Sequence, residues 1–143
     1  MRAALTALAA SVAVAATAAA PRRQPLTLKV LAQRRPAELS RLLQSVAAAR
    51  YPADAVVDVE IHVDASKKSP GLFARRDPKC VAGRKAVLAA AKAWTWRHEV
   101  TIIKARENKG IREAWLSAYD PSLTGEELGR ILILEDDVEL SPA

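Results

Sequence analysis

Three consecutive acidic residues, Glu135, Asp136 and Asp137, directly follow the apolar run Ile131–Leu134. Four aliphatic residues in a row leave no position for a water-facing side chain, which indicates a strand covered on both faces, as in a parallel sheet. In open α/β sheets, ligands bind beyond the carboxyl ends of the strands, where these acids would lie. Because adjacent carboxylates repel one another, the arrangement favours a bound divalent cation. The alternative interpretation is a solvated acidic turn.

The elements that must position these acids alternate between strand and helix patterns from residue 26 onward. We expect strands over residues 26–31, 56–63, 100–105 and 131–134. We expect helices from 36 to about 51, from about 81 to 97, and from 111 to 119, the last one stopped by Asp120-Pro121. A polar loop over residues 67–79 separates the second strand from the second helix. This succession with short connections predicts a parallel sheet with right-handed crossovers.

Apolar spacing within the expected helices predicts which faces are buried. The first helix carries its apolar residues at helical offsets from one another: Leu39, Leu42, Leu43 and Val46. For the second helix the expected buried set is Val87, Leu88, Ala91, Trp94 and Thr95, and for the third it is Ile111, Ala114, Trp115 and Ala118. Before the last strand, Thr124 and Glu127 have the spacing of a capping box.

Composition fits one soluble globular domain with a basic surface. The chain has 143 residues, of which 50% are hydrophobic and 27% charged, and a formal net charge of +6. A positive charge suits a phosphate-bearing small molecule, an anionic membrane or nucleic acid. The Lys and Arg residues are scattered without interleaved aromatic residues, so we expect no nucleic-acid partner. Cys80 is the only cysteine, which excludes a disulfide or a cysteine-rich metal site within this sequence.

The first 20 residues differ in composition from the rest. After Met1-Arg2, an Ala-rich uncharged run extends to Ala20. A positive start, an apolar middle and small residues at the end predict a secretory signal peptide. A weak signal anchor is the second interpretation, since the run is nearly long enough to span a bilayer, and an organellar transit peptide is the third. We therefore divide the chain into this segment (1–20), a linker (21–25) and a globular domain (26–143).

Four segments of that domain carry a resemblance to a known family. They are Ala32–Pro36 after the first strand, Val59–Asp64, Glu107–Gly110 before a helix with Trp115, and Ile131–Pro142 with its acidic triplet. In this order they resemble the nucleotide-sugar-binding half of GT-A glycosyltransferases, most closely family 2-type enzymes and N-acetylglucosaminyltransferases of glycan branching. The resemblance implies an α/β, Rossmann-like GT-A fold, a mostly parallel sheet with flanking helices, truncated after the strand that bears the DxD motif.

The resemblance also implies an activity. Such an enzyme transfers a sugar from a UDP- or GDP-sugar to a glycan or glycoprotein acceptor, with inversion at the anomeric carbon. A Mn²⁺ or Mg²⁺ ion neutralises the departing diphosphate as a Lewis acid. The resemblance places the protein in the secretory pathway, in the Golgi lumen or anchored to its membrane. The carboxylate base that inversion requires would lie beyond Ala143, so the catalytic residues are unknown and we expect this chain to be inactive or nearly so.

Residue roles follow from the same resemblance. Asp137 would ligate the metal, while Glu135 and Asp136 would face the ribose and the sugar. Asp64 would accept a hydrogen bond from the base. The other residues implied at the nucleotide-sugar are Gln33, Arg34, Asn108, Gly110 and Arg112, the last toward the sugar or the phosphates.

Each role has a structural alternative. Asp64 and Asn108 are residue types that cap turns and helices. Arg34 and Arg35 are also explained as solvated charges beside Pro36. The remaining aromatic candidates are treated as packing residues (Trp94, Trp96 and Trp115) or as structural residues (His62 and His98).

Two other folds with acidic residues after a strand are excluded by sequence. A Walker B interpretation of the last strand requires an upstream phosphate loop, and Gly83–Ala86 does not match its pattern. A phospho-acceptor receiver domain places paired acids after its first strand rather than its fourth. The remaining rival is a non-catalytic fragment that binds a nucleotide or a partner protein without turnover.

Overall fold

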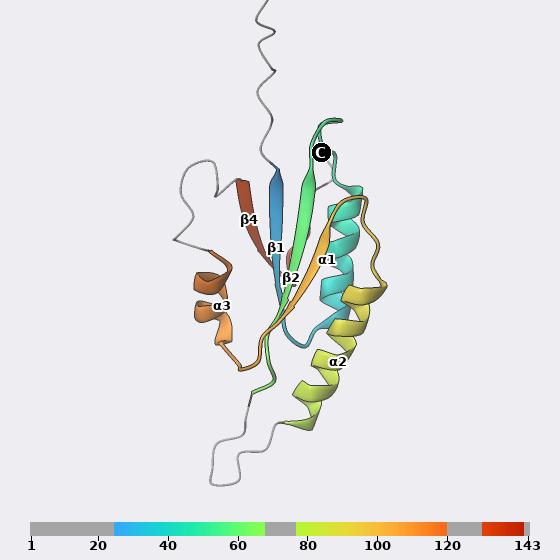
Figure 1. Cartoon of the computed structure of the whole chain (residues 1–143). Coiled ribbons are helices and arrows are strands. Elements are labelled where there is room, and N and C mark those ends of the chain that lie inside the picture. The colour runs from blue at the N-terminus through green and yellow to red at the C-terminus, as the bar shows by residue number, and fades with distance from the viewer. Residues whose placement is uncertain (1–24, 68–76, 120–129, 142–143) are drawn as a thin grey trace, which may run out of the picture.

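The computed structural model describes residues 25–67, 77–119 and 130–141, which form four strands and three helices in strict alternation (Figure 1). They are β1 (Leu26–Ala32), α1 (Pro36–Ala48), β2 (Val57–Val63), α2 (Pro78–Ala93), β3 (Val100–Lys104), α3 (Gly110–Ala118) and β4 (Arg130–Glu135). All strand pairs in the described residues are parallel. The predicted fold class, an α/β parallel sheet with flanking helices, is confirmed.

The strand order β3-β2-β1-β4 determines where a ligand can bind. The chain steps outward from β1 to β2 to β3, and α3 then returns it past β1 to β4. Because right-handed crossovers in opposite directions place their helices on opposite faces, α1 and α2 cover one face and α3 lies on the other (Figure 1). The direction of winding therefore reverses between β1 and β4, and the carboxyl ends of these two strands flank a topological switch point.

The hydrophobic core lies between the sheet and α1 and α2. Strand β2 alternates strictly, with its four apolar side chains at most 1% exposed on this face. The predicted α1 face is fully buried against them: Leu39, Leu42, Leu43 and Val46. Each such side chain contributes about 1.5–3 kcal/mol relative to an exposed position. The spacing of apolar residues within α1 and β2 therefore predicts which of their faces form this core.

The opposite face of the sheet, where α3 lies, carries charged side chains on its central strands. Lys29 and Glu60 are partners in the β1–β2 register, and their Nζ and Oε2 atoms are 3.3 Å apart. His62 Nε2 lies 3.0 Å from the same Glu60 oxygen. His62 therefore has a structural contact on this face, outside the core.

The predicted burial is wrong on β4 and on α3. Strand β4 is not covered on both faces: Leu132 is 40% exposed and only Leu134 is buried, because β4 is the edge strand of the described sheet. On α3, Ile111 and Trp115 are exposed and Ala118 is the fully buried residue. The correct pattern of apolar residues does not reveal how much of a strand or helix its neighbours cover.

Helix α2 begins and ends earlier than predicted. Pro78 occupies its first turn, and the side chain of Asp77 caps it by accepting a hydrogen bond from the Lys79 amide at 2.9 Å. The helix ends at Ala93 because Trp94 adopts an extended conformation. Thr95, predicted to be buried in the helix, is exposed beyond its end.

An aromatic cluster occupies the segment after α2. The rings of Trp94 and Trp96 stack at 5.5 Å, and Tyr51 meets Trp96 edge-on at 5.9 Å. The Arg97 guanidinium lies 5.2 Å from the centres of both the Tyr51 and the Trp96 rings. Trp96 Nε1 donates to the Val57 carbonyl at 2.6 Å, which ties the cluster to the start of β2. Trp94 and Trp96 are therefore packing residues, as predicted.

Several predictions fall outside the described residues. They concern the leader segment and linker (1–24), most of the loop after β2, and the capping box of Thr124 and Glu127. Among the helices that the structure does describe, none combines the length and apolar character needed to cross a bilayer.

Candidate functional site

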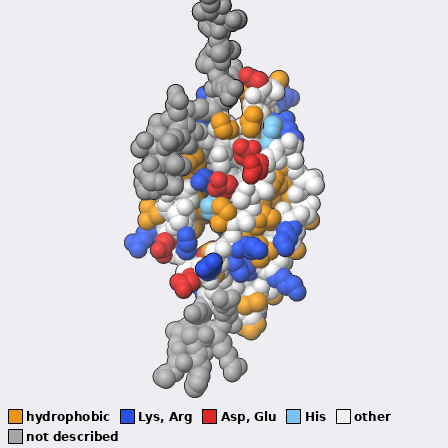
Figure 2. Space-filling model, in the orientation of Figure 1, with side chains coloured by type: hydrophobic (Ala, Val, Ile, Leu, Met, Phe, Trp, Pro, Cys, Tyr) orange, Lys and Arg blue, Asp and Glu red, His pale blue; other side chains and the backbone are white. Residues whose placement is uncertain are grey.

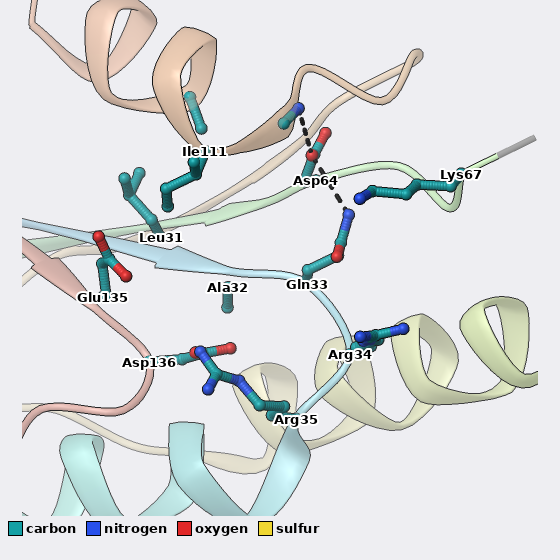
Figure 3. Close-up of a pocket in the computed structure, with 12 residues that line it drawn as sticks. Leu31, Ala32, Gln33, Arg34, Arg35, Asp64, Lys67, Ile111, Glu135 and Asp136 are labelled. Carbon is teal, nitrogen blue, oxygen red and sulfur yellow. Dashed lines mark hydrogen bonds and ion pairs between the residues drawn. The ribbon is translucent and has the colours of Figure 1, made fainter.

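A cleft of about 320 Å³ opens at the carboxyl ends of β1, β2 and β4, at the switch point of the sheet (Figure 3). Strands β2 and β4 are both parallel to β1, so Asp64 and the acidic triplet follow the same edge. Six of the eight residues predicted at the nucleotide-sugar line this cleft: Gln33, Arg34, Asp64, Gly110, Glu135 and Asp136. The structure thus brings together residues from all four segments that carry the resemblance.

Asp64 joins the end of β2 to the start of α3. Its Oδ1 atom accepts hydrogen bonds from the backbone amides of Ala65 and Lys109, at 2.7 and 2.9 Å. Its Oδ2 atom accepts from Asn108 Nδ2 at 2.8 Å and from the Gly110 amide at 3.1 Å. Gly110 has φ = 70°, a left-handed conformation that glycine adopts without a steric penalty, and the chain turns there into α3. Asp64 is therefore a helix-capping and turn-holding residue.

The neighbours of Asp64 complete this connection. Asn108 Nδ2 also donates to the Ala65 carbonyl at 2.7 Å, so Asn108 has a structural contact, but it does not cap α3, whose N-cap residue is Lys109. Gln33 Nε2 lies 3.4 Å from Asp64 Oδ2 and 3.3 Å from the Ala65 carbonyl, so the loop after β1 reaches the same turn. A hydrogen bond from a base to Asp64 stays a prediction.

Arg84 was not predicted, yet it fixes two strand ends from α2. Its Nε atom donates to the Asp64 carbonyl and its Nη2 atom to the Ala105 carbonyl, each at 2.9 Å. These bonds satisfy backbone acceptors where β2 and β3 end. A single arginine on a helix has no distinguishing spacing, so this role could not be predicted from the sequence.

Gly83 allows α2 to pack directly on the loop after β1. A Cβ atom at this position would lie 2.8 Å from the Arg34 carbonyl oxygen and 2.9 Å from Arg34 Cβ. Contacts this short with backbone atoms cannot be relieved by rotating a side chain. The packing of α2 at Gly83 therefore determines the position of the loop that carries Gln33 and Arg34.

We predict that Gly83→Ala destabilises the protein by about 1 kcal/mol. Alanine gains about 1 kcal/mol in helix propensity, but overpacking against a backbone costs about 1–3 kcal/mol. Denaturant unfolding measures the change, and amide chemical shifts should move in residues 33–35. The matched control is Ala82→Gly, an exposed neighbour in the same helix. A stabilisation by Gly83→Ala as large as the loss in Ala82→Gly would show that the close approach has no cost.

The three acids of the triplet diverge. Glu135 lies on the α3 side, where its Oε1 atom accepts a hydrogen bond from Trp115 Nε1 at 2.9 Å. Asp136 lies on the α1 side, is 3% exposed, and forms an ion pair with Arg35 Nη2 (Figure 3). Asp137 is exposed, and its Oδ2 atom is 3.0 Å from Arg35 Nη1. One guanidinium therefore bridges the last two acids.

The environment supports a charged Arg35. Desolvation alone would lower the pKa of Arg35, but the charges of Asp136 and Asp137 raise it above its ordinary value. Burial raises the pKa of Asp136, and the charge of Arg35 acts in the opposite direction. The buried carboxylate thus depends on Arg35 as its counter-ion.

The residues of the triplet do not form a metal-ligand set. Mn²⁺ or Mg²⁺ at a phosphate site is held by one or two carboxylates together with phosphate oxygens. Across residues 25–67, 77–119 and 130–141, no group of three or more His, Cys, Asp or Glu side chains is placed to hold a metal ion. Asp136 and Asp137 hold Arg35, and Glu135 faces Trp115. Ligation of a metal by Asp137 stays a prediction that this geometry does not support.

The remaining predicted residue and two missed ones concern positive charge. Arg112 is exposed on α3 and does not line the described cleft, so its predicted contact with a sugar or phosphates has no support. Arg35 and Lys67 do line it. Arg35 had the alternative interpretation of a solvated charge beside Pro36. Its place just before a helix-starting proline was the one signal available.

No family model and no curated protein matches this sequence. Among solved structures, S. aureus TarS is similar with a TM-score of 0.42 and 13% sequence identity, over 79% of this chain and 16% of that chain. The class that the fold and the site define is an α/β protein with a polar cleft at its switch point.

Proposed function

We propose that this chain is the nucleotide-sugar-binding part of a glycosyltransferase. The observation that supports the proposal best is the convergence of four sequence segments on one cleft at the switch point. Each segment was singled out by its resemblance to GT-A enzymes, and they are far apart in the sequence. The donor would be a UDP- or GDP-sugar, and the acceptor a glycan or glycoprotein.

The charges around the cleft suit a diphosphate. Lys and Arg side chains gather over the lower part of the molecule, where the strands end (Figure 2). Arg34, Arg35 and Lys67 line the cleft itself. The N-terminus of α3, which begins at Gly110, also lies at the cleft, but the Asp64 carboxylate already accepts from the Lys109 and Gly110 amides there. The three acids that line the cleft also have protein partners: Asp64 accepts backbone amides, Glu135 accepts from Trp115, and Asp136 pairs with Arg35.

Further details implied by the resemblance stay predictions. They are single displacement with inversion and a secretory destination directed by residues 1–20, whereas the expected dependence on Mn²⁺ or Mg²⁺ has no converging group of ligands in the described residues behind it.

The proposal predicts binding of nucleoside diphosphates that depends on the cleft. Calorimetric titration of the chain with UDP, GDP and ADP should identify one preferred base. Lys67→Ala should weaken that binding by about three- to tenfold, because one exposed cation beside a phosphate is lost. Lys92→Ala, which removes an exposed lysine from the last turn of α2, is the matched control. Absence of binding to all three nucleotides would refute the proposed function.

A further inference from the structure

We propose that Arg35 is the cation that binds the diphosphate in this cleft, held in place by Asp136 and Asp137, and that this binding needs no divalent metal ion. The inference rests on the proposed nucleotide-sugar function. It replaces the expected role of the acidic triplet with a different one, in which the last two acids position an arginine.

Arg35 is anchored from two directions. Its Nη2 and Nη1 atoms pair with Asp136 and Asp137, residues more than 100 positions away in the sequence. Pro36 follows it as the first residue of α1, so its backbone is fixed by the start of a helix. A guanidinium held by two carboxylates and a rigid backbone loses little conformational freedom when it binds a ligand. Arg35 is thus preorganised at the edge of the cleft.

Hydrogen-bonding capacity remains after these ion pairs. A guanidinium has five N–H donors, and the two carboxylates engage two of them. The Arg35 side chain is 44% exposed and lines the cleft. Planar, forked donors of this kind match phosphate oxygens and form charge-assisted hydrogen bonds. Arg34 and Lys67 line the same cleft and add positive charge.

The same contacts explain why a metal ion is not needed. Asp136 is almost completely buried, so a cation in the cleft would reach its carboxylate only by displacing Arg35. If a metal ion displaced Arg35, the buried Asp136 carboxylate would lose the counter-ion that its burial requires. Glu135 lines the cleft from the α3 side, where it accepts a hydrogen bond from Trp115. The triplet therefore offers a metal only Asp137, which Arg35 already engages, and Glu135 on the opposite side of the cleft.

The test compares nucleoside diphosphate binding in EDTA and in MnCl₂. UDP and GDP are titrated calorimetrically into the wild-type chain, Arg35→Ala and Arg35→Lys, with circular dichroism to verify folding. We expect the wild-type affinity to differ by less than about twofold between the two buffers. Arg35→Ala should lose at least about tenfold in both, and Arg35→Lys should be intermediate, because lysine keeps the charge without the fork. The control is Arg41→Ala, an exposed arginine of α1 that pairs with Glu139 at 3.5 Å.

The outcomes separate this inference from the proposed function. Binding that requires Mn²⁺ and is unaffected in Arg35→Ala and Arg35→Lys would overturn the inference and leave the function standing. Absence of nucleotide binding in both buffers would refute the function itself. A titration with Mn²⁺ alone gives an independent readout. We expect Asp137→Asn to leave that titration unchanged, and loss of a wild-type Mn²⁺ site in this variant would also overturn the inference.

Discussion

Asp64→Ala is expected to lower the free energy of unfolding by about 2–3 kcal/mol and to release the N-terminus of α3. Three hydrogen bonds of ordinary length from beyond the adjacent residue are lost, from Asn108 Nδ2 and the amides of Lys109 and Gly110, together with a longer one from Gln33 Nε2. Each donor costs about 1 kcal/mol when its bond is lost, at the low end of the range because water reaches this turn. Denaturant unfolding measures the loss, and hydrogen exchange should accelerate at residues 109–113.

Two controls isolate the contribution of Asp64. Asp77→Ala removes a carboxylate that caps α2 through a single bond to the Lys79 amide, and should cost about 1 kcal/mol. Asp64→Asn keeps the size of the side chain, but its NH₂ group cannot accept hydrogen bonds from the surrounding donors. We therefore expect this variant to recover little of the stability lost in Asp64→Ala. If Asp64→Ala cost no more than Asp77→Ala, the carboxylate would not hold α3.

Trp96→Ala is expected to cost about 3 kcal/mol, within the range for removal of a large aromatic side chain. The indole stacks on Trp94, meets Tyr51 edge-on, and bonds to the Val57 carbonyl at the start of β2. Its removal opens a cavity at the amino end of the sheet and leaves that carbonyl without its partner. Thermal unfolding and tryptophan fluorescence measure the effect.

Trp96→Phe is the matched control, because it keeps an aromatic ring and loses the N–H donor. It should cost about 1 kcal/mol. The cluster contacts the start of β2, whereas the cleft lies where β2 ends, so nucleotide affinity should be unchanged in both variants. A change within about 0.5 kcal/mol for Trp96→Ala would be typical of an exposed surface residue and would contradict the packing role.

The order of strands and helices and the core face of α1 could be predicted because their signals are local. The spacing of Leu39, Leu42 and Val46 repeats over two turns, and β2 alternates over seven residues. The exposure of Leu132 could not be predicted, because it depends on whether β4 is an edge strand. Periodicity identifies an element and its orientation, whereas the strand order decides what covers it.

The candidate site, too, could be predicted only in part. The positions of Asp64 and the acidic triplet followed from the rule that ligands bind at the carboxyl ends of parallel strands. Their partners did not follow, because the contacts are set by three-dimensional packing. Arg35 and Asp136 are 101 residues apart, and no local pattern connects a basic residue before one helix to an acid after a distant strand. The sequence indicated where charge would gather and left open which cation neutralises it.

The β1–β4 pairing has a consequence for biosynthesis. β1 leaves the ribosome about a hundred residues ahead of β4, so its outer edge has no partner until residues 130–135 emerge. High contact order of this kind slows folding, and an unpaired strand edge promotes aggregation. The half formed by β1, β2 and β3 with α1 and α2 can condense first around its own apolar interior. The nascent chain therefore completes its cleft last. Chaperone dependence should be greatest between the emergence of β1 and that of β4.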